Sequence, residues 1–272
     1  MSPAALAGLT LFEPIAGLLA RFPFARLPDA AALTALLAEV APAAVAGSGL
    51  PIRFTLPPAG DIAYEAHIHA TGQVPTRADD WHDFFNALAW CVWPTSKAAC
   101  NALHLREQQA RHAAGLPGRG PLRDALTQFD ECGIVVVSSD PAIPAHLARH
   151  EWEAAFWHRR QRLADTTRFL VFGHGSWDQL RAPFVGLCAK ALYRVVEPGW
   201  LALPDAERQR DTDAWLADRL TGQPFGKADL FPLPLLGVPG VTPHSESPDY
   251  YRDTRQFRPL RAAHRGKVHT RL

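Results

Sequence analysis

The sequence has no closely spaced pair of cysteines. Its four cysteines are spread along the chain and never form a CxxC pair: Cys91, Cys100, Cys132 and Cys188. Zinc ribbons and thioredoxin-like redox sites need such pairs, so the spacing excludes both. Free thiols in a reducing compartment are the expected state, and we predict a cytoplasmic protein.

Long apolar runs are also missing. The apolar run within residues 1–22 is not preceded by a basic segment and is interrupted by Glu13 and Pro14. We therefore predict neither a secretory signal nor an anchor. No other stretch approaches the roughly 18 apolar residues that a membrane-spanning helix needs. We therefore expect no membrane partner.

An excess of charge of either sign is absent as well. The chain has 28 basic and 27 acidic residues, for a formal net charge of +1 at pH 7. No global field would draw the whole protein onto nucleic acid, so such binding would have to be local. The one strongly basic run, RPLRAAHRGKVHTRL at residues 258–272, makes nucleic acid a possible partner of the C-terminal tail.

The chain is nevertheless long and apolar enough to bury a substantial core. It has 272 residues, 47% of them hydrophobic, and we expect one helix-rich α+β domain around a small mixed sheet. Residues 1–50 are predicted to be a helical preface and residues 51–221 the main α+β body. Residues 222–272 are predicted to be an extended Pro/Gly-rich arm that packs on the body and ends in the basic tail.

The spacing of apolar side chains predicts the elements of the body. Residues 52–56 and 62–70 alternate apolar and polar side chains, which predicts two adjacent antiparallel strands, and further strands are expected at 134–139 and 168–172. Helices are expected at residues 14–22, 29–41, 81–93, 96–114, 144–164 and 177–196. Asp80 is the predicted N-cap of the helix that begins at Trp81, and Ser176 with Gln179 is a predicted capping box.

The first turns of the helix that begins at Trp81 combine polar side chains with large aromatics. His82 and Asn86 lie one turn apart, and Asp83 stands three residues before Asn86. A histidine in such a place can be a general base or a metal ligand. In the competing interpretation Asp83 caps the helix and His82 is an interior polar group with its hydrogen bonds satisfied.

His174 is the best single candidate for a functional residue. It lies in FGHGS, directly after a predicted strand, where flanking glycines let a ligand approach the backbone. The alternative is a plain turn histidine. The order of residues in GHGSW does not match the GxSxG nucleophile elbow, so a serine-hydrolase site of that kind is excluded.

Several other polar pairs have spacings that could suit metal binding or acid and base roles. Asp130 and Glu131 precede a predicted strand, where turn chemistry explains acids equally well. His67 and His69 would share one face of a strand, but no third ligand accompanies them. His146 and His150 have the spacing of HExxH, yet Leu147 stands where the catalytic glutamate belongs, which excludes that metalloprotease motif.

Beyond these individual sites, a series of motifs runs along the chain. They are VPTR, WHDFFNALAW, the Pro-Thr-x-Lys-Ala-Ala-x-Asn run at 94–101, RDALTQFDECG, WEAAFWHRR, VFGH, PFVGLCAKA, PLPLLGVPG and YYRDTRQFRP. Over about Tyr64 to Pro259 the chain resembles the bacterial proteins grouped as domain of unknown function 3025. Gly175 and Cys132 depart from the residues expected there, alanine and a small polar residue. The resemblance implies no established activity.

The resemblance adds a shortlist of polar residues that fall inside its motifs. They are Glu65, Arg77, His82, Asp83, Asn86, Arg123, Asp124, Asp130 and His174. If several of them converge in one cleft, an enzyme becomes the leading interpretation. If they are scattered as caps and turns, it does not.

Two functions of different classes follow from these residues. The first is a cytoplasmic enzyme of hydrolase or phosphoryl-handling type, in which His82 and His174 act as acid and base or bind a divalent metal. Asp83 or Asp130 would be their partner. Asn86 and either Arg77 or Arg123 would bind a small-molecule or phosphate-bearing ligand. The alternative is a non-catalytic protein that binds nucleic acid or another protein through the basic and aromatic segment 152–162 and the tail.

Overall fold

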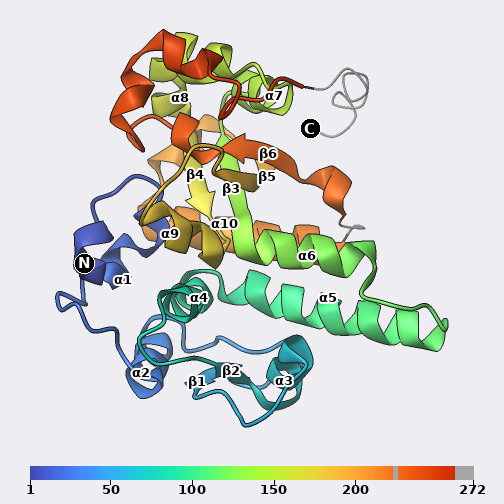
Figure 1. The fold of residues 1–272 in the computed structure, drawn as a ribbon. Coiled ribbons are helices and arrows are strands. Elements are labelled where there is room, and N and C mark those ends of the chain that lie inside the picture. Colours follow the sequence, from blue (N-terminus) through green and yellow to red (C-terminus); the bar gives the residue numbers. More distant parts are fainter. Residues whose placement is uncertain (223–225, 261–272) are drawn as a thin grey trace.

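The computed structural model describes residues 1–222 and 226–260 (Figure 1). A four-stranded mixed sheet in the order β4-β3-β5-β6 lies at its centre. The strands are β3 (Gly133–Ser138), β4 (Thr167–Val171), β5 (Cys188–Val195) and β6 (Phe231–Pro234). β3 runs antiparallel to β4 and parallel to β5, and β6 closes the far edge antiparallel to β5. All six residues of β3 are buried, as its continuous apolar run predicts for a central strand.

A second, two-stranded sheet lies below the first in the view of Figure 1. β1 (Arg53–Thr55) and β2 (Gln73–Pro75) pair in parallel, and α3 (Tyr64–Thr71) connects them. Parallel neighbours need such a crossover connection, which a hairpin turn could not provide. The α3 helix packs on α5 (Pro94–Ala113), so this small unit is tied to the main body.

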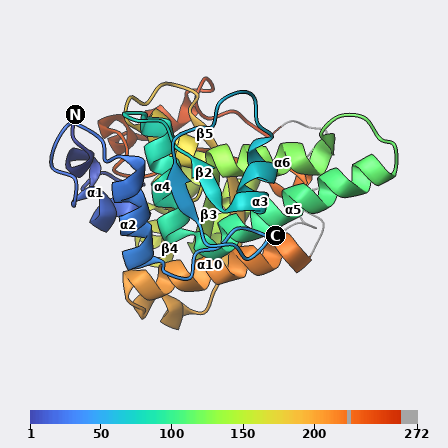
Figure 2. The same cartoon turned by 90° about the horizontal axis from the view of Figure 1, so that it is seen from below.

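Helices surround both sheets. The others are α1 (Ala16–Leu19), α2 (Ala30–Val40), α4 (Trp81–Val92), α6 (Gly120–Cys132), α7 (Ala142–Ala148), α8 (Arg160–Thr166), α9 (His174–Leu180) and α10 (Asp205–Gly222). Figures 1 and 2 show α5 and α6 side by side as a hairpin that projects from the body, with α10 running along α5. The α9 helix contacts both α4 and α6, so the elements that carry the candidate histidines meet.

Short helical turns complete the chain. They are the 3₁₀ helices Pro3–Leu6, Glu13–Ile15, Pro198–Ala202, Lys227–Asp229, Leu235–Gly237, Pro243–Glu246 and Pro248–Arg252, and the π-helical turn Ala154–His158. The C-terminal arm buries Leu235, Tyr251 and Phe257 in the common core. The N-terminal residues bury Leu6, Phe12 and many others in that core. The result is the α+β, helix-rich domain around a small mixed sheet that the sequence predicts.

The predicted hairpin of strands at 52–56 and 62–70 is wrong in its second half. Residues 64–71 form α3, which ends where Gly72 adopts φ 68° and donates its N–H to the Ile68 carbonyl. The apparent alternation was misleading because only Ile68 is buried in this helix. Consequently His67 and His69 do not share a strand face, and the metal pair proposed for them is lost.

The predicted helix at 177–196 is also wrong. The chain forms α9 only as far as Leu180, and Pro183 and Gly186, with φ 97°, precede the strand β5. In β5 half-buried and buried residues alternate along CAKA, which fits a strand against β3. The α9 helix begins at His174 with Gly173 as its N-cap, so Ser176 and Gln179 do not form the predicted capping box.

The predicted continuous helix at 144–164 is broken into three pieces. His150 adopts a left-handed conformation, φ 57°, and lies outside the first helical segment, Ala142–Ala148, which contains His146. The helix α10 was not predicted, since residues 205–222 had no assignment. Among the described residues, no helix is both long and apolar enough to cross a bilayer.

Candidate metal centre

Two glycines bring the ends of four elements together. Gly173, between β4 and α9, faces the junction of α6 and β3, and a Cβ atom there would lie 2.4 Å from the Gly133 nitrogen. The Phe172 and Gly173 amides both donate to the Gly133 carbonyl, at 2.9 Å. Only glycine at 173 allows so close an approach. The approach places His174, the first residue of α9, beside Glu131 at the end of α6.

α4 supplies the third member of the cluster. The Asp80 carboxylate accepts a hydrogen bond from the Asp83 amide at 3.0 Å, which confirms the predicted N-cap. At the other end of α4, the Trp93 indole donates to the Val171 carbonyl at 2.9 Å and so fixes the helix against β4. His82, in the first turn, thereby points its ring at that of His174, with 4.5 Å between ring centroids.

His82, Glu131 and His174 converge on one point. The two Nε2 atoms lie 3.0 Å apart, and each lies 3.7 Å from Glu131 Oε1. One ligand atom from each residue fits within 4.8 Å of the others. Two bonds of about 2.0–2.1 Å from a tetrahedral zinc to imidazole nitrogens place those nitrogens about 3.3 Å apart. The observed separations are therefore close to those of a metal ligand set.

The three side chains differ in their exposure. The His174 side chain is 5% exposed, whereas those of His82 and Glu131 are 36% and 45% exposed. Burial lowers the pKa of His174 to about 3, an effect that the nearby Asp130 carboxylate only partly opposes. Burial also raises the pKa of Glu131, against the influence of His82. His174 is thus neutral at physiological pH, the form in which imidazole binds metals.

Asp130 and Lys97 form a buried ion pair behind His174. Lys97 Nζ lies 2.6 Å from Asp130 Oδ1, and Asp130 Oδ2 lies 3.8 Å from His174 Nδ1. Burial opposes ionisation of Asp130, but the Lys97 ammonium holds its pKa below the usual value. A carboxylate at a helix C-terminus faces the negative end of the dipole, so its presence here needs a cation such as Lys97. His174 Nδ1 itself is buried without a hydrogen-bond partner among the described residues.

Asn86 extends this buried network away from the histidines. Its Oδ1 accepts from Lys97 Nζ at 3.0 Å, and its Nδ2 donates to the Tyr64 hydroxyl at 2.8 Å. Asn86 therefore positions Lys97 and lies one step behind Asp130. The predicted ligand-binding residue is in the network, but at the back of the site.

Two predicted residues, Asp83 and Arg77, pair with each other. Arg77 donates to both carboxylate oxygens of Asp83 at 2.8 Å and also contacts Asp80. This arrangement holds the pKa of Asp83 low against the effect of burial. Asp83 is therefore engaged in the local structure at the start of α4.

Arg123, Asp124 and Glu65 also have places outside the His82, Glu131 and His174 cluster. Arg123 lies two turns before Asp130 on α6, and its buried Nε has no hydrogen-bond partner among the described residues. Asp124 faces Lys227 at 3.8 Å, and the Glu65 carboxylate accepts from Asn101 at 2.7 Å. The structure thus brings together His82, His174 and Asp130 from the sequence-based site, and adds Glu131.

Glu131 and Lys97 were not among the predicted site residues. Glu131 stood in the sequence beside Asp130 as one of a pair of acids, but turn chemistry explained both equally well. For Lys97 a signal existed: Lys97, Asn101 and His104 fall on one helix face, three and four residues apart, and all three are buried. Polar residues along a buried stripe indicate a polar network.

Comparison with known proteins identifies a family for which no activity is stated. The family model described as "Protein of unknown function (DUF3025)" matches residues 52–261. No curated protein and no solved structure matches the chain.

Proposed function

This chain belongs to the DUF3025 family, and we propose that its function is hydrolysis at a divalent transition-metal centre bound by His82, Glu131 and His174. The convergence of two imidazole nitrogens and one carboxylate oxygen is the observation that supports this proposal. Two histidines and one glutamate are a common ligand set of catalytic zinc. The neutral state of His174 leaves its Nε2 lone pair available to a metal.

The exposure of the three side chains favours a catalytic centre over a structural one. Structural zinc sites are closed by four protein ligands, whereas catalytic sites keep one position for water. Here three protein ligands are present, and two of them reach solvent. A zinc ion held by His82, Glu131 and His174 would supply Lewis-acid chemistry and would activate water at neutral pH.

Asp130, which lies on the Nδ1 side of His174, supports the same interpretation. Metal-bound histidines usually donate their second ring N–H to a carboxylate or carbonyl, which fixes the tautomer. His174 directs Nδ1 toward Asp130 and Nε2 toward His82 and Glu131. A small shift of the ring would shorten the 3.8 Å separation from Asp130 to a hydrogen bond.

Metal binding is the first test. We would remove metal with a chelator, titrate the full chain with Zn²⁺ and with Co²⁺, and record the visible absorption of the Co²⁺ form. The expected result is one metal per chain, with tetrahedral cobalt bands that the H82A/H174A variant lacks. The matched control is H146A, which removes a histidine that already has two partners. Absence of metal binding in the parent would overturn the proposal and leave a His82–His174 hydrogen bond.

Hydrolysis is the second test. Zinc-loaded and chelator-treated protein would be compared on 4-nitrophenyl esters and on bis(4-nitrophenyl) phosphate. We expect zinc-dependent turnover of one class, lost in H82A/H174A. The same ligand set also binds nonhaem iron in oxygenases, so a parent that retains iron and hydrolyses neither class would contradict the hydrolase.

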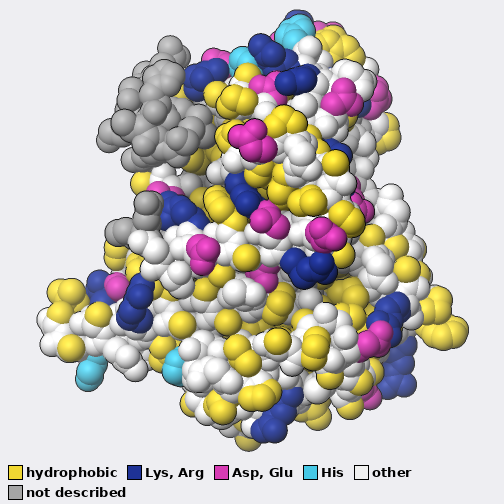
Figure 3. Space-filling model, turned by 180° about the vertical axis from the view of Figure 1, so that it is seen from behind, with side chains coloured by type: hydrophobic (Ala, Val, Ile, Leu, Met, Phe, Trp, Pro, Cys, Tyr) yellow, Lys and Arg dark blue, Asp and Glu magenta, His cyan; other side chains and the backbone are white. Residues whose placement is uncertain are grey.

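Our predictions on partners and location stay proposals. The basic run at 258–272, predicted to bind nucleic acid, lies outside the described residues from residue 261 onward. Figure 3 shows acidic and basic side chains interspersed over the rear face, which does not favour nucleic acid there. All four cysteines are free in the structure, which supports our proposal of a reducing, cytoplasmic location.

A further inference from the structure

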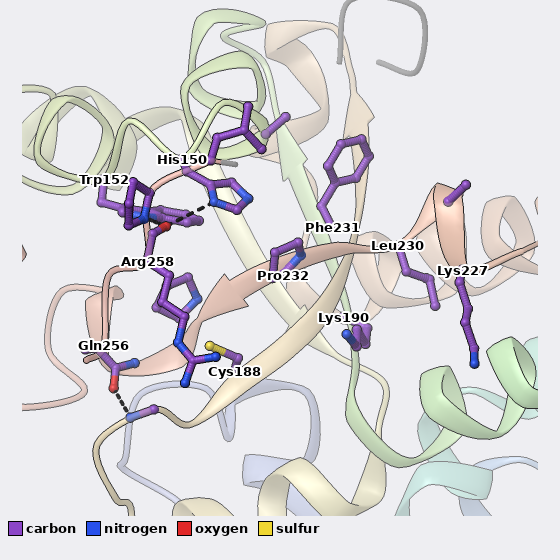
Figure 4. Close-up of a pocket in the computed structure, with 16 residues that line it drawn as sticks. His150, Trp152, Cys188, Lys190, Lys227, Leu230, Phe231, Pro232, Gln256 and Arg258 are labelled. Carbon is purple, nitrogen blue, oxygen red and sulfur yellow. Dashed lines mark hydrogen bonds between the residues drawn. The ribbon is translucent and has the colours of Figure 1, made fainter. Parts of the chain in front are cut away.

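A pocket of about 690 Å³ lies between β5, β6 and the C-terminal arm (Figure 4). Its walls include the buried side chains of Trp152, Leu230 and Phe231. The volume is within the range of about 300–1,000 Å³ that is usual for small-molecule sites. Its lining is mainly apolar with a few charged groups, as such sites generally are.

The described charged residues that line this pocket are all cations. Lys190, on β5, and Arg258, on the arm, line it, together with Lys227 at the far end in Figure 4. Among the described residues, no Asp or Glu lines it, and of the three cations only Lys227 has an acidic partner, the exposed Asp124. Lys190 and Arg258 form no ion pair with any described residue. The pocket therefore has unpaired positive charge.

Arg258 and Lys190 converge on Cys188. Burial raises the pKa of the Cys188 thiol, and both cations oppose that rise, Arg258 more strongly. Cys188 and Lys190 are two residues apart on β5 and so project from the same face of the sheet. Figure 4 shows the Arg258 guanidinium directed toward Cys188. An anion placed there would contact two cations at once.

The backbone of Arg258 is held firmly in this place. Its carbonyl accepts hydrogen bonds from the Trp152 indole at 2.9 Å and from His150 Nδ1 at 3.1 Å. Gln256, two residues earlier, accepts from the Gly186 amide at 2.5 Å and donates to the Leu187 carbonyl at 3.1 Å. The backbone of Arg258 is therefore fixed, while its guanidinium has no hydrogen-bond partner among the described residues, as expected of a preorganised ligand contact.

We propose that this pocket binds a small organic anion, a carboxylate or a phosphate on an apolar chain or ring. Lys190 and Arg258 bind the anionic group, and the walls around Trp152 and Phe231 bind the apolar body. The segment 261–272, which follows Leu260 at the pocket's edge, has several basic residues and no Asp or Glu. Charge therefore makes it a poor occupant of a cationic pocket.

Calorimetric titration of the full chain with matched eight-carbon probes tests this. Octanoate and octyl phosphate carry the anion, whereas octanol has the same chain without charge. We expect at least one anionic probe to bind about tenfold or more tightly than octanol. Which of the two binds better identifies the anionic group. Equal affinity of octanol and both anions would overturn the proposal, as would no binding at all.

The variant K190Q/R258Q tests the assigned residues. It should lose the advantage of the anionic probe over octanol, whereas R255Q should keep it, because Arg255 is exposed, lies outside the lining and pairs with Asp253. Retained melting temperature would show that K190Q/R258Q is folded. An unchanged affinity of K190Q/R258Q for the anion would overturn the proposal.

Two further titrations separate this pocket from other causes of binding. Carboxylates also coordinate metals, so octanoate could bind at the histidines. If it binds in this pocket, it should bind H82A/H174A as tightly as the parent. Loss of binding in that variant would place the anion at the histidines and overturn the proposal. Affinity should rise about fourfold for each methylene from hexanoate to octanoate, as burial of the chain in an apolar pocket predicts. A flat dependence on chain length would contradict the apolar walls.

Discussion

Two groups of histidine and glutamate in this protein look alike in composition and differ in the use of their ring nitrogens. In one, His146 Nδ1 lies 2.5 Å from Glu151, and His146 Nε2 accepts from Arg159 at 2.9 Å. In the other, the Nε2 atoms of His82 and His174 face each other and Glu131. The first histidine has a protein partner for each nitrogen. The second pair directs its two Nε2 atoms at one shared point, which is the arrangement that a metal requires.

The carboxylates behind these histidines differ as strongly. Asp130 pairs with Lys97, and the two side chains are 16% and 6% exposed. Glu151 pairs with Arg149, and these side chains are 43% and 30% exposed. An ion pair of the first kind maintains a fixed charge inside the protein, whereas one of the second kind is weakened by solvent. The comparison predicts different costs for breaking each.

The largest effect is expected at Lys97. The variant K97M leaves the Asp130 carboxylate buried without its cation, and we expect a loss of about 3–5 kcal/mol in the free energy of unfolding. R149M, the same kind of change in the exposed pair, should cost no more than about 1 kcal/mol. Urea denaturation at pH 7 measures both.

A double variant checks that explanation for Lys97. K97M/D130N removes both charges, so its cost should be well below the sum of the costs of the two single variants. Additive costs would show that Lys97 stabilises the fold through packing alone and would remove the contrast between the two ion pairs.

The next largest effect is expected on metal affinity, which should depend on His174 and should not depend on His146. The single variant H174A removes one of three ligands and leaves the buried position empty, so we expect Zn²⁺ to bind roughly 100- to 1,000-fold more weakly, as the loss of a direct ligand should exceed that of an outer partner. H146A should bind Zn²⁺ as the parent does. Competition against a fluorescent zinc chelator gives both dissociation constants, and an equal loss in the two variants would contradict the comparison.

The partner behind His174 should have a smaller effect. D130N keeps the size of the side chain but removes the negative charge that faces His174 Nδ1, and we expect Zn²⁺ affinity to fall about 10- to 100-fold. K97M/D130N separates this effect from the unpaired Lys97 charge, since it should show a similar loss. Affinity unchanged in both variants would limit Asp130 to a structural pairing with Lys97.

The site shows which parts could be predicted from sequence. His82 and His174 were identifiable because each stands next to a helix start or a strand end, where local signals are strong. Asp83 has the same local signals, and nothing in the spacing shows that Asp83 pairs with Arg77 while Asp130 lies behind His174. The place of Asp130 depends on Lys97, which approaches it from another helix. Such partners come from tertiary packing, which local spacing does not encode.

The fold shows the same division. The central strand β3 was predictable from a continuous apolar run, and the helices α4 and α5 from caps and prolines. The segment that became α3 alternates like a strand, and tertiary contact with α5 decided in favour of a helix. For β5, the Ala and Leu residues that suggested a helix become buried when this strand pairs in parallel with β3. Local pattern is a weak guide where packing partners lie far along the chain.

The smallest effect is expected in the exposed group, and it should depend on pH. The hydrogen bond from Arg149 lowers the pKa of Glu151, with a smaller contribution from His146. A lowered folded-state pKa stabilises the fold above the unfolded pKa, and that stability is lost as the pH falls through the folded value. E151Q should therefore cost at most about 1 kcal/mol at pH 7, because solvent screens the pair, and less near pH 3, which lies below the unfolded pKa. Thermal melts of parent and variant at both pH values measure this difference. A cost that is the same at pH 3 as at pH 7 would mean that Glu151 acts through neutral hydrogen bonds, and that charge does not distinguish the two histidine groups.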